Sequence, residues 1–293
     1  MSRRRWRRRG RRRIRNVLIS LVLLGVVAGA VLYIVFYILL RPKEMWRKQI
    51  FEGVYLSTLN IPEQFGEGKA MIAEIHWDVP GVELFFRPFY PRATMRKHFT
   101  LLPADYLVWR HDLSIMMNSA RYVPGEWYKS IPFRQVDALE TLVWDGNVSH
   151  IHNHSYMFGW DANENFLYDR QKPPKKEFLK QLKWGIGVQS ISVMEGELRL
   201  EAMNHSADLD ARTFLGVDPI KKIMWLIVYD KIDDLGMNTI ARDAGIFVGG
   251  KLDSNDAATM IIGSGANGVT PYTGIRGRRP LGGVMGVKAN PID

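Results

Sequence analysis

The chain has 293 residues, enough for one large domain or two small ones, and its hydrophobic content of 46% and charged content of 24% are ordinary for a globular protein. Its net charge of +10 arises at the N-terminus, because ten of the 40 basic residues are arginines between Arg3 and Arg15, and the other 30 balance the 30 acidic residues. The folded part therefore has no excess positive charge to hold a phosphate backbone, and we expect no nucleic-acid partner.

The first 40 residues predict a membrane anchor. Residues 1–16 form an Arg-rich tail, and Val17–Leu40 is apolar without a charge, longer than the roughly 20 residues that span a bilayer as a helix. A signal peptide cleaved near Ala28-Gly29-Ala30 is the competing interpretation, but the apolar run continues ten residues past Ala30, whereas signal sequences have a core of about 7–15. We therefore expect one transmembrane helix over residues 17–40 that contacts membrane lipid.

The basic tail and the lack of cysteine predict where the protein resides. Under the positive-inside rule the tail stays cytoplasmic, so the C-terminal part is periplasmic or extracellular. The chain has no cysteine, and exported domains without disulfides are common in bacteria. We expect a single-pass inner-membrane protein of a bacterial envelope, in which residues 41–69 connect the anchor to a domain over residues 70–293.

The exported part shows short apolar runs divided by turns, with few helical segments. This pattern predicts an α+β domain with a mixed or antiparallel β-sheet core and short helices. In chain order we expect a hairpin of strands 70–77 and 82–89, a helix at 101–108, strands at 113–117 and 140–144, a helix at 175–183, strands at 186–194 and 223–229, a helix at 239–244 capped by Asn238 or Thr239, a strand at 258–262 and a glycine-rich loop at 263–283. The run at 223–229 is apolar throughout and predicts a strand buried on both faces.

Three stretches combine strand ends with polar residues. They are IMMNSARY (115–122), ARTFLGVDPIKKIMWLIVYD (211–230), and KLDSNDAATMIIG (251–263) with RRPLGGVMGV (278–287). In this order and spacing they resemble the phosphodiester glycosidase family, which includes the enzyme that uncovers mannose 6-phosphate by removing N-acetylglucosamine. The resemblance extends from about Ile72 to Val287 and implies that family's fold and a glycosidase acting on sugar phosphodiesters.

The resemblance is weakest at residues 252–259. Where the family has Leu-Asp-Gly-Gly-Gly-Ser-Ser-Thr, this chain has Leu-Asp-Ser-Asn-Asp-Ala-Ala-Thr. Asn and Asp tolerate left-handed backbone better than most residues, so the turn can persist without glycine. The two serine hydroxyls are lost with Ala257 and Ala258, and Ser254 and Asp256 are the nearby residues that could substitute for them.

Cleavage of a sugar–phosphate diester needs a carboxylate near the anomeric carbon and a guanidinium on the phosphate. The matched positions supply these groups. We predict Asp253, Arg212 and Asp256 as catalytic residues, with Arg212 and Arg279 on the phosphate, and Asn118, Thr213, Arg279, Ser254 and Thr259 as substrate-binding residues. The alternative is that Asp253 caps a turn and Arg212 forms a buried ion pair.

A different pattern, HIHNH, puts His150, His152 and His154 on one face of an extended segment. Imidazole binds zinc, copper and nickel, although residues two apart along a strand are widely spaced for one ion. We predict no cofactor, with a divalent metal possible and these three histidines as the alternative metal site.

The location and the matched residues favour a membrane-anchored envelope hydrolase that cleaves a glycosidic or sugar-phosphodiester bond in a saccharide. The altered turn favours the alternative, a catalytically inactive glycan-binding or scaffolding protein on the same fold. The sequence leaves the sugar and the oligomeric state open.

Overall fold

The computed structural model describes Ala28 and residues 46–89, 99–123, 132–149, 151–199, 208–270, 273–277 and 279–292. The chain divides into two compact units, Met1–Lys43 and Glu44–Asp293. In the first unit only Ala28, which is helical, is described, so the rest of the expected span Val17–Leu40 lies outside the described residues. No helix within the described ranges is both long and apolar enough to cross a bilayer.

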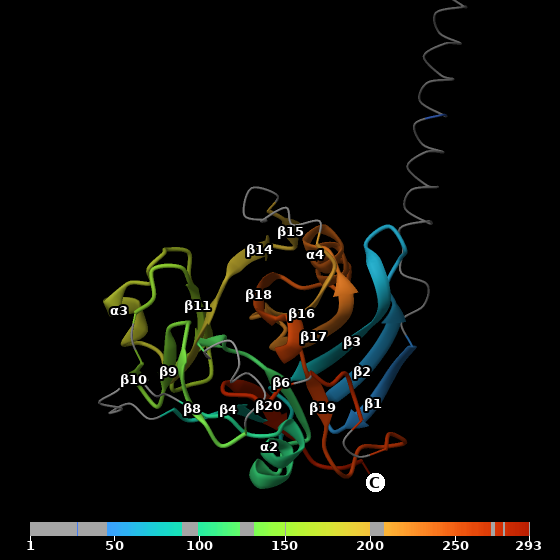
Figure 1. Cartoon of the computed structure of the whole chain (residues 1–293), viewed down its shortest axis with the longest axis horizontal. Coiled ribbons are helices and arrows are strands. Elements are labelled where there is room, and N and C mark those ends of the chain that lie inside the picture. The colour runs from blue at the N-terminus through green and yellow to red at the C-terminus, as the bar shows by residue number, and fades with distance from the viewer. Residues whose placement is uncertain are drawn as a thin grey trace, which may run out of the picture. The chain divides into compact units, whose positions relative to one another are not determined.

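An eight-stranded sheet dominates the second unit (Figure 1). Its strands, in spatial order, are β1 (Trp46–Phe51), β2 (Val54–Asn60), β3 (Gly66–His76), β17 (Ile223–Ile232), β16 (Asp210–Asp218), β18 (Val248–Ser254), β14 (Ser190–Met194) and β15 (Glu197–Leu198). The segment expected to be a connector, residues 41–69, thus carries β1, β2 and the start of β3.

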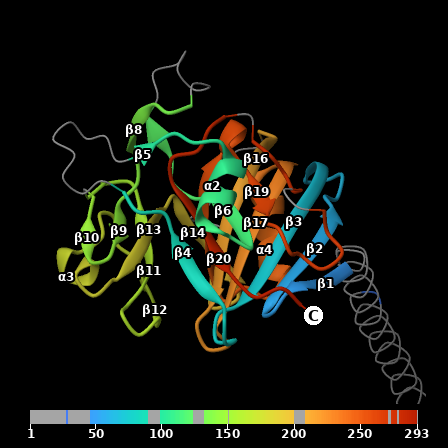
Figure 2. The same cartoon turned by 90° about the horizontal axis from the view of Figure 1, so that it is seen from below.

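Three smaller sheets complete the described strands. The five-stranded sheet has the order β10 (Asn147–Val148), β9 (Leu142–Trp144), β13 (Trp184–Val188), β11 (Tyr156–Trp160) and β12 (Phe166–Asp169). The four-stranded sheet has the order β19 (Met260–Ile262), β6 (Ile115–Asn118), β20 (Val284–Lys288) and β4 (Glu83–Phe86). The three-stranded sheet has the order β5 (Phe99–Thr100), β8 (Gln135–Ala138) and β7 (Tyr122–Val123). In both views the five-stranded sheet lies to one side of the eight-stranded sheet (Figure 2). All pairings between the described strands are antiparallel.

The helices are short, and the described ones are α2 (Ala104–His111), α3 (Lys176–Leu179), α4 (Asp234–Asp243) and the 3-10 turn η3 (Asn255–Ala257). Antiparallel sheets with a few short helices confirm the α+β class predicted from the sequence.

Both faces of the eight-stranded sheet are buried at its central strand β17. Ile227 and Tyr229 of β17 pack with Ile240 of α4 on one face. Leu226 and Val228 of the same strand join the main core cluster on the other face, which includes residues from the smaller sheets. Residues 223–229 are all buried, which confirms the predicted strand and explains why this segment has no polar alternation.

Three local predictions need correction. The runs at 70–77 and 82–89 do not form a hairpin, because β3 pairs with β2 and β17 whereas β4 pairs with β20. The single strand expected at 186–194 is two strands, β13 and β14, which belong to different sheets. The helix expected at 239–244 begins earlier, at Asp234, where the Asp233 side chain accepts a hydrogen bond from the Gly236 amide and caps it. The run at 186–194 was expected to be one strand because apolar periodicity does not show where a chain bends from one sheet into another.

Candidate functional site

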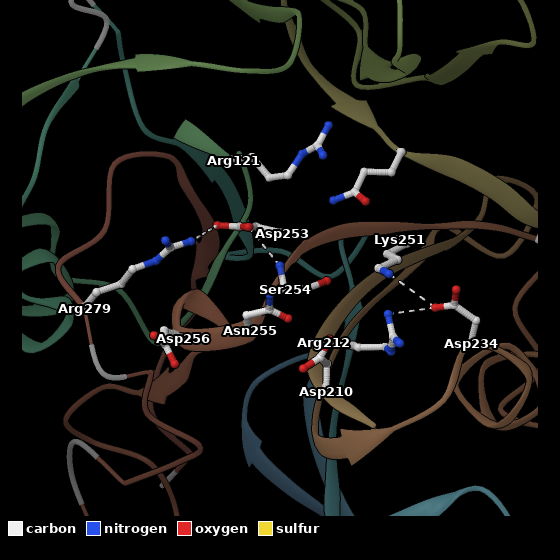
Figure 3. A pocket seen from close by; sticks show the side chains of 11 residues that line it. Arg121, Asp210, Arg212, Asp234, Lys251, Asp253, Ser254, Asn255, Asp256 and Arg279 are labelled. Carbon is white, nitrogen blue, oxygen red and sulfur yellow. Dashed lines mark hydrogen bonds and ion pairs between the residues drawn. The ribbon is translucent and has the colours of Figure 1, made fainter. Parts of the chain in front are cut away.

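A cavity of about 540 Å³ opens where β16, β18, α4 and the loop before β20 meet (Figure 3). It is lined by Arg121, Gln189, Asp210, Arg212, Asp234, Lys251, Asp253, Ser254, Asn255, Asp256 and Arg279. Its wall is thus almost entirely charged or amide-bearing, which suits a polar, hydroxyl-rich or anionic ligand.

Asp253 is the buried carboxylate of this cavity, with a residue exposure of 4%. Its Oδ1 accepts a hydrogen bond from the Ser254 amide at 2.9 Å, and its Oδ2 lies 3.4 Å from Nη2 of Arg279 (Figure 3). Burial raises the pKa of the Asp253 carboxyl to about 6, although Arg279 and Arg121 act in the opposite direction. The group is therefore mainly ionised at neutral pH and becomes protonated in mild acid.

The turn after Asp253 uses a left-handed asparagine. Asn255 has φ of 62°, a conformation that asparagine adopts more readily than most side chains. Asn255 is the first residue of the 3-10 turn η3, which presents Asp256 to the cavity. Ala257 and Ala258 are buried and bring no hydroxyl. Ser254 lines the cavity, but its hydroxyl is buried and has no hydrogen-bond partner among the described residues.

Three of the predicted substrate-binding residues hold this turn instead of lining the cavity. The Thr213 hydroxyl donates to the Asp253 carbonyl oxygen. Asn118 Oδ1 accepts from the Thr259 amide at 2.8 Å. Thr259 Oγ1 accepts from the Gly277 amide at 2.6 Å, which ties in the loop that carries Arg279. These polar groups set the position of the Asp253 carboxylate and of Arg279.

Arg212 forms a buried ion pair at another part of the wall. Its Nη1 lies 2.8 Å from Oδ1 of Asp234, and both side chains are almost inaccessible. Its Nε donates to the Ile232 carbonyl at 2.7 Å. Lys251 Nζ approaches the same Asp234 oxygen at 3.3 Å, and burial, together with Arg212, lowers the pKa of Lys251. Two cations therefore share one carboxylate (Figure 3).

A second ion pair borders the Asp253 side of the cavity. Arg121 Nε donates to Oε1 of Glu140, whose side chain is 2% exposed. Burial raises the pKa of Glu140 to about 7, Arg121 lowers it, and the charge of Asp253 raises it further. The charge of Asp253 thus acts on the Glu140 carboxyl.

The histidine pattern is not assembled into a ligand set in the described part of the chain. His152 Nε2 lies 3.2 Å from the Ala138 carbonyl oxygen, and His154 is exposed. His150 lies outside the described residues. Among those described, no group of three or more His, Asp or Glu side chains is placed to hold a metal ion.

Of the predicted site residues, the cavity brings together Arg212, Asp253, Ser254, Asp256 and Arg279. Sequence reasoning missed other lining residues, notably Arg121 and Gln189. Arg121 had a usable signal, since it follows the strand end at Asn118 by three positions. Gln189 and Glu140 had none, because each is a single polar residue at the edge of an apolar run.

Comparison with known proteins shows the fold. No protein-family model matches the chain, and no curated protein is similar to it in sequence. Among solved structures, the catalytic domain of zebrafish N-acetylglucosamine-1-phosphodiester alpha-N-acetylglucosaminidase, auto-inhibited by its pro-peptide, superposes with a TM-score of 0.56 at 13% identity, covering 83% of this chain and 88% of that one. The chain therefore shares the fold of a glycosidase catalytic domain.

Two bacterial structures have the same fold. A hypothetical protein from Synechocystis gives a TM-score of 0.60 at 11% identity over 82% of this chain and 62% of that one. A protein from Burkholderia pseudomallei K96243, considered to be exported, gives 0.54 at 9% identity over 76% and 74%. At these identities the likeness concerns the fold alone, and function has to be argued from the cavity.

Proposed function

We propose that this protein is an envelope hydrolase that cleaves a glycosidic or sugar-phosphodiester bond in a saccharide. The observation that carries the proposal is the buried carboxylate of Asp253, which faces a polar cavity with the Arg279 guanidinium 3.4 Å away. A carboxylate beside a guanidinium is the pair that cleavage at an anomeric carbon next to a phosphate requires. The shared fold with a domain named for this bond supports the choice.

In the proposed reaction the bond between the anomeric carbon and the phosphate oxygen breaks, and that oxygen keeps the electron pair. The ionised Asp253 stabilises the positive charge on the sugar or bonds to the anomeric carbon, and water then supplies the new hydroxyl. The departing phosphate monoester is already a stable anion, so it needs cationic hydrogen-bond donors more than a proton. Arg279 supplies such donors beside Asp253. Asp256 is exposed, lines the same cavity and is available to sugar hydroxyls.

Location is part of this proposal. We propose that Val17–Leu40 anchors the chain in the inner membrane with residues 1–16 in the cytoplasm, so that the cavity lies outside the cytoplasm. Cell-envelope saccharides are then the accessible substrates.

The test is release of free sugar from an N-acetylglucosamine-1-phosphodiester by the full-length chain in detergent, with Asp253→Asn alongside. We expect release by the wild type and a loss of about 10³-fold or more in the variant. Equal release by a correctly folded Asp253→Asn protein would contradict the assignment of Asp253.

One observation favours a second candidate, a glycan-binding protein without turnover. The loop that should carry two hydroxyls has buried Ala257 and Ala258 in their place. Saturable binding of envelope saccharides by the wild type with no bond cleavage would support this candidate over the hydrolase.

A further inference from the structure

Arg121 is a cavity cation whose terminal nitrogens have no partner among the described residues. Its Nε is used by Glu140, and the Nη groups form no hydrogen bond with any described residue. The side chain is 36% exposed and lines the cavity (Figure 3). A guanidinium held through Nε presents its two Nη groups as a fork that matches two oxygens of a phosphate or carboxylate.

The other cations of the wall are engaged. Arg212 and Lys251 both contact Asp234. Arg279 contacts Asp253 and lies 4.8 Å over the ring of Tyr122. Arg121 is the residue before Tyr122. This short segment therefore supplies one cation to the cavity and also the aromatic ring on which Arg279 lies.

Glu140 sets the direction of Arg121. The backbone holds the two segments together, since the Leu139 amide donates to the Arg121 carbonyl at 2.8 Å. Glu140 is 2% exposed and does not line the cavity, and its Oε2 has no hydrogen-bond partner within the described chain. Glu140 contacts Arg121 through Nε, so the Nη groups stay directed to the cavity. Such a buried contact holds the arginine side chain in one rotamer, as supporting residues do in preorganised sites.

We propose that Arg121, positioned by Glu140, is an anion-binding group of this cavity that contacts a phosphate or another oxyanion of the bound saccharide. This deepens the proposed function by assigning the residue that recognises the anionic group, and it rests on that function for its place in catalysis. Binding can be measured without turnover, so the two proposals can fail separately.

The experiment measures binding of N-acetylglucosamine 1-phosphate to the full-length chain by calorimetry, with inorganic phosphate as the second probe. Arg121→Gln is expected to weaken binding of both probes by about tenfold or more, since a charge-assisted bidentate contact is lost. The matched control is Arg276→Gln, because Arg276 is a half-exposed arginine paired with Asp105 outside the cavity; its affinity should equal that of the wild type.

The role of Glu140 is tested by rescue and by a double-mutant cycle. Glu140→Gln keeps an acceptor for Arg121 Nε and should retain most of the affinity, whereas Glu140→Ala should lose it. In the Arg121→Gln background, Glu140→Ala should cause no further loss, because Glu140 acts through Arg121. A merely structural role would instead give additive losses.

Several outcomes would overturn the inference. One is unchanged affinity in Arg121→Gln, and another is the same loss in Arg276→Gln. A third is no binding of either probe to the wild type at about 10 mM. If sugar is released but Arg121→Gln binds normally, the hydrolase stands and this inference fails. If Arg121→Gln binds weakly but no sugar is released by the wild type, the inference stands and the hydrolase fails.

Discussion

The guanidinium of Arg279 lies 3.4 Å from the carboxylate of Asp253, a residue that is 4% exposed. The two residues are separated by 26 positions and come from the end of β18 and from the loop before β20. Burial raises the pKa of Asp253 to about 6 in spite of this contact, so its charge changes just below neutral pH.

This pKa predicts the pH dependence of turnover. The proposed mechanism uses the carboxylate form, so kcat/KM should fall as the pH decreases through about 6. The measurement is sugar release at constant ionic strength between pH 4.5 and 8. A rate that increases towards acid pH would show that the protonated form of Asp253 is the active one and would contradict this role.

Glu140 should make stability depend on pH. Its pKa in the folded protein is about 7 against 4.5 for an ordinary glutamate, so between these values the folded state holds a proton that the unfolded state has lost. The free energy of unfolding should therefore fall as the pH rises from about 4.5 to 7, by on the order of 3 kcal/mol from this group.

Glu140→Gln should remove this part of the pH dependence, because glutamine does not titrate. Urea unfolding of both proteins at several pH values measures the difference in slope. Asp253 is present in both proteins, so the difference between the two curves reports the titration of Glu140 together with its interaction with Asp253. Parallel stability curves for the wild type and Glu140→Gln would mean that Glu140 titrates normally.

The ion pair of Arg212 and Asp234 should contribute to stability. Arg212→Met leaves a buried Asp234 carboxylate with Lys251 as its remaining cation at 3.3 Å, and removing one partner of a buried pair costs about 3–5 kcal/mol. The control is Arg242→Met, since Arg242 pairs with Asp243 at the surface and should cost about 1 kcal/mol or less. If Arg212→Met matched the control in stability but lost phosphate binding, Arg212 would be a ligand-binding residue instead.

The left-handed Asn255 should limit which residues this turn accepts. Asn255→Val should destabilise the protein by about 1–2 kcal/mol, since a branched side chain is strained at φ of 62°. Asn255→Gly should change stability little, because glycine has no such strain. Thermal unfolding is the readout. Asn163→Val, at an exposed position with ordinary φ, serves as the control and should have a smaller effect.

Part of the candidate site could be predicted from sequence because it rests on short-range patterns. Asn118 follows from an apolar run that stops at a polar residue, and it ends β6. Asp253 follows from the acidic, small-residue stretch at 252–259, and it lies at the end of β18. The class of fold followed from the same alternation of short runs and turns. A left-handed turn without glycine was also predicted, since asparagine and aspartate tolerate such a backbone better than most residues, and Asn255 adopts it.

Other features depended on which strands pair. The apolar run at 186–194 bends between two sheets, and Gln189 at the bend reaches the cavity only because β14 pairs with β18. Arg212 was predicted as a phosphate ligand or as half of a buried ion pair, and nothing in the sequence near it identifies Asp234, which lies 22 positions away, as its partner.

The sequence by itself determined the short-stranded α+β character, the fully apolar strand at 223–229 and the acidic turn at Asp253, because these arise from local hydrophobicity and backbone preference. Only the tertiary structure decided which charges meet in the cavity. Glu140 behind Arg121, and Arg279 beside Asp253, are contacts between distant segments. Burial there shifts the carboxyl pKa values, and burial is a property of the assembled chain that no single segment carries.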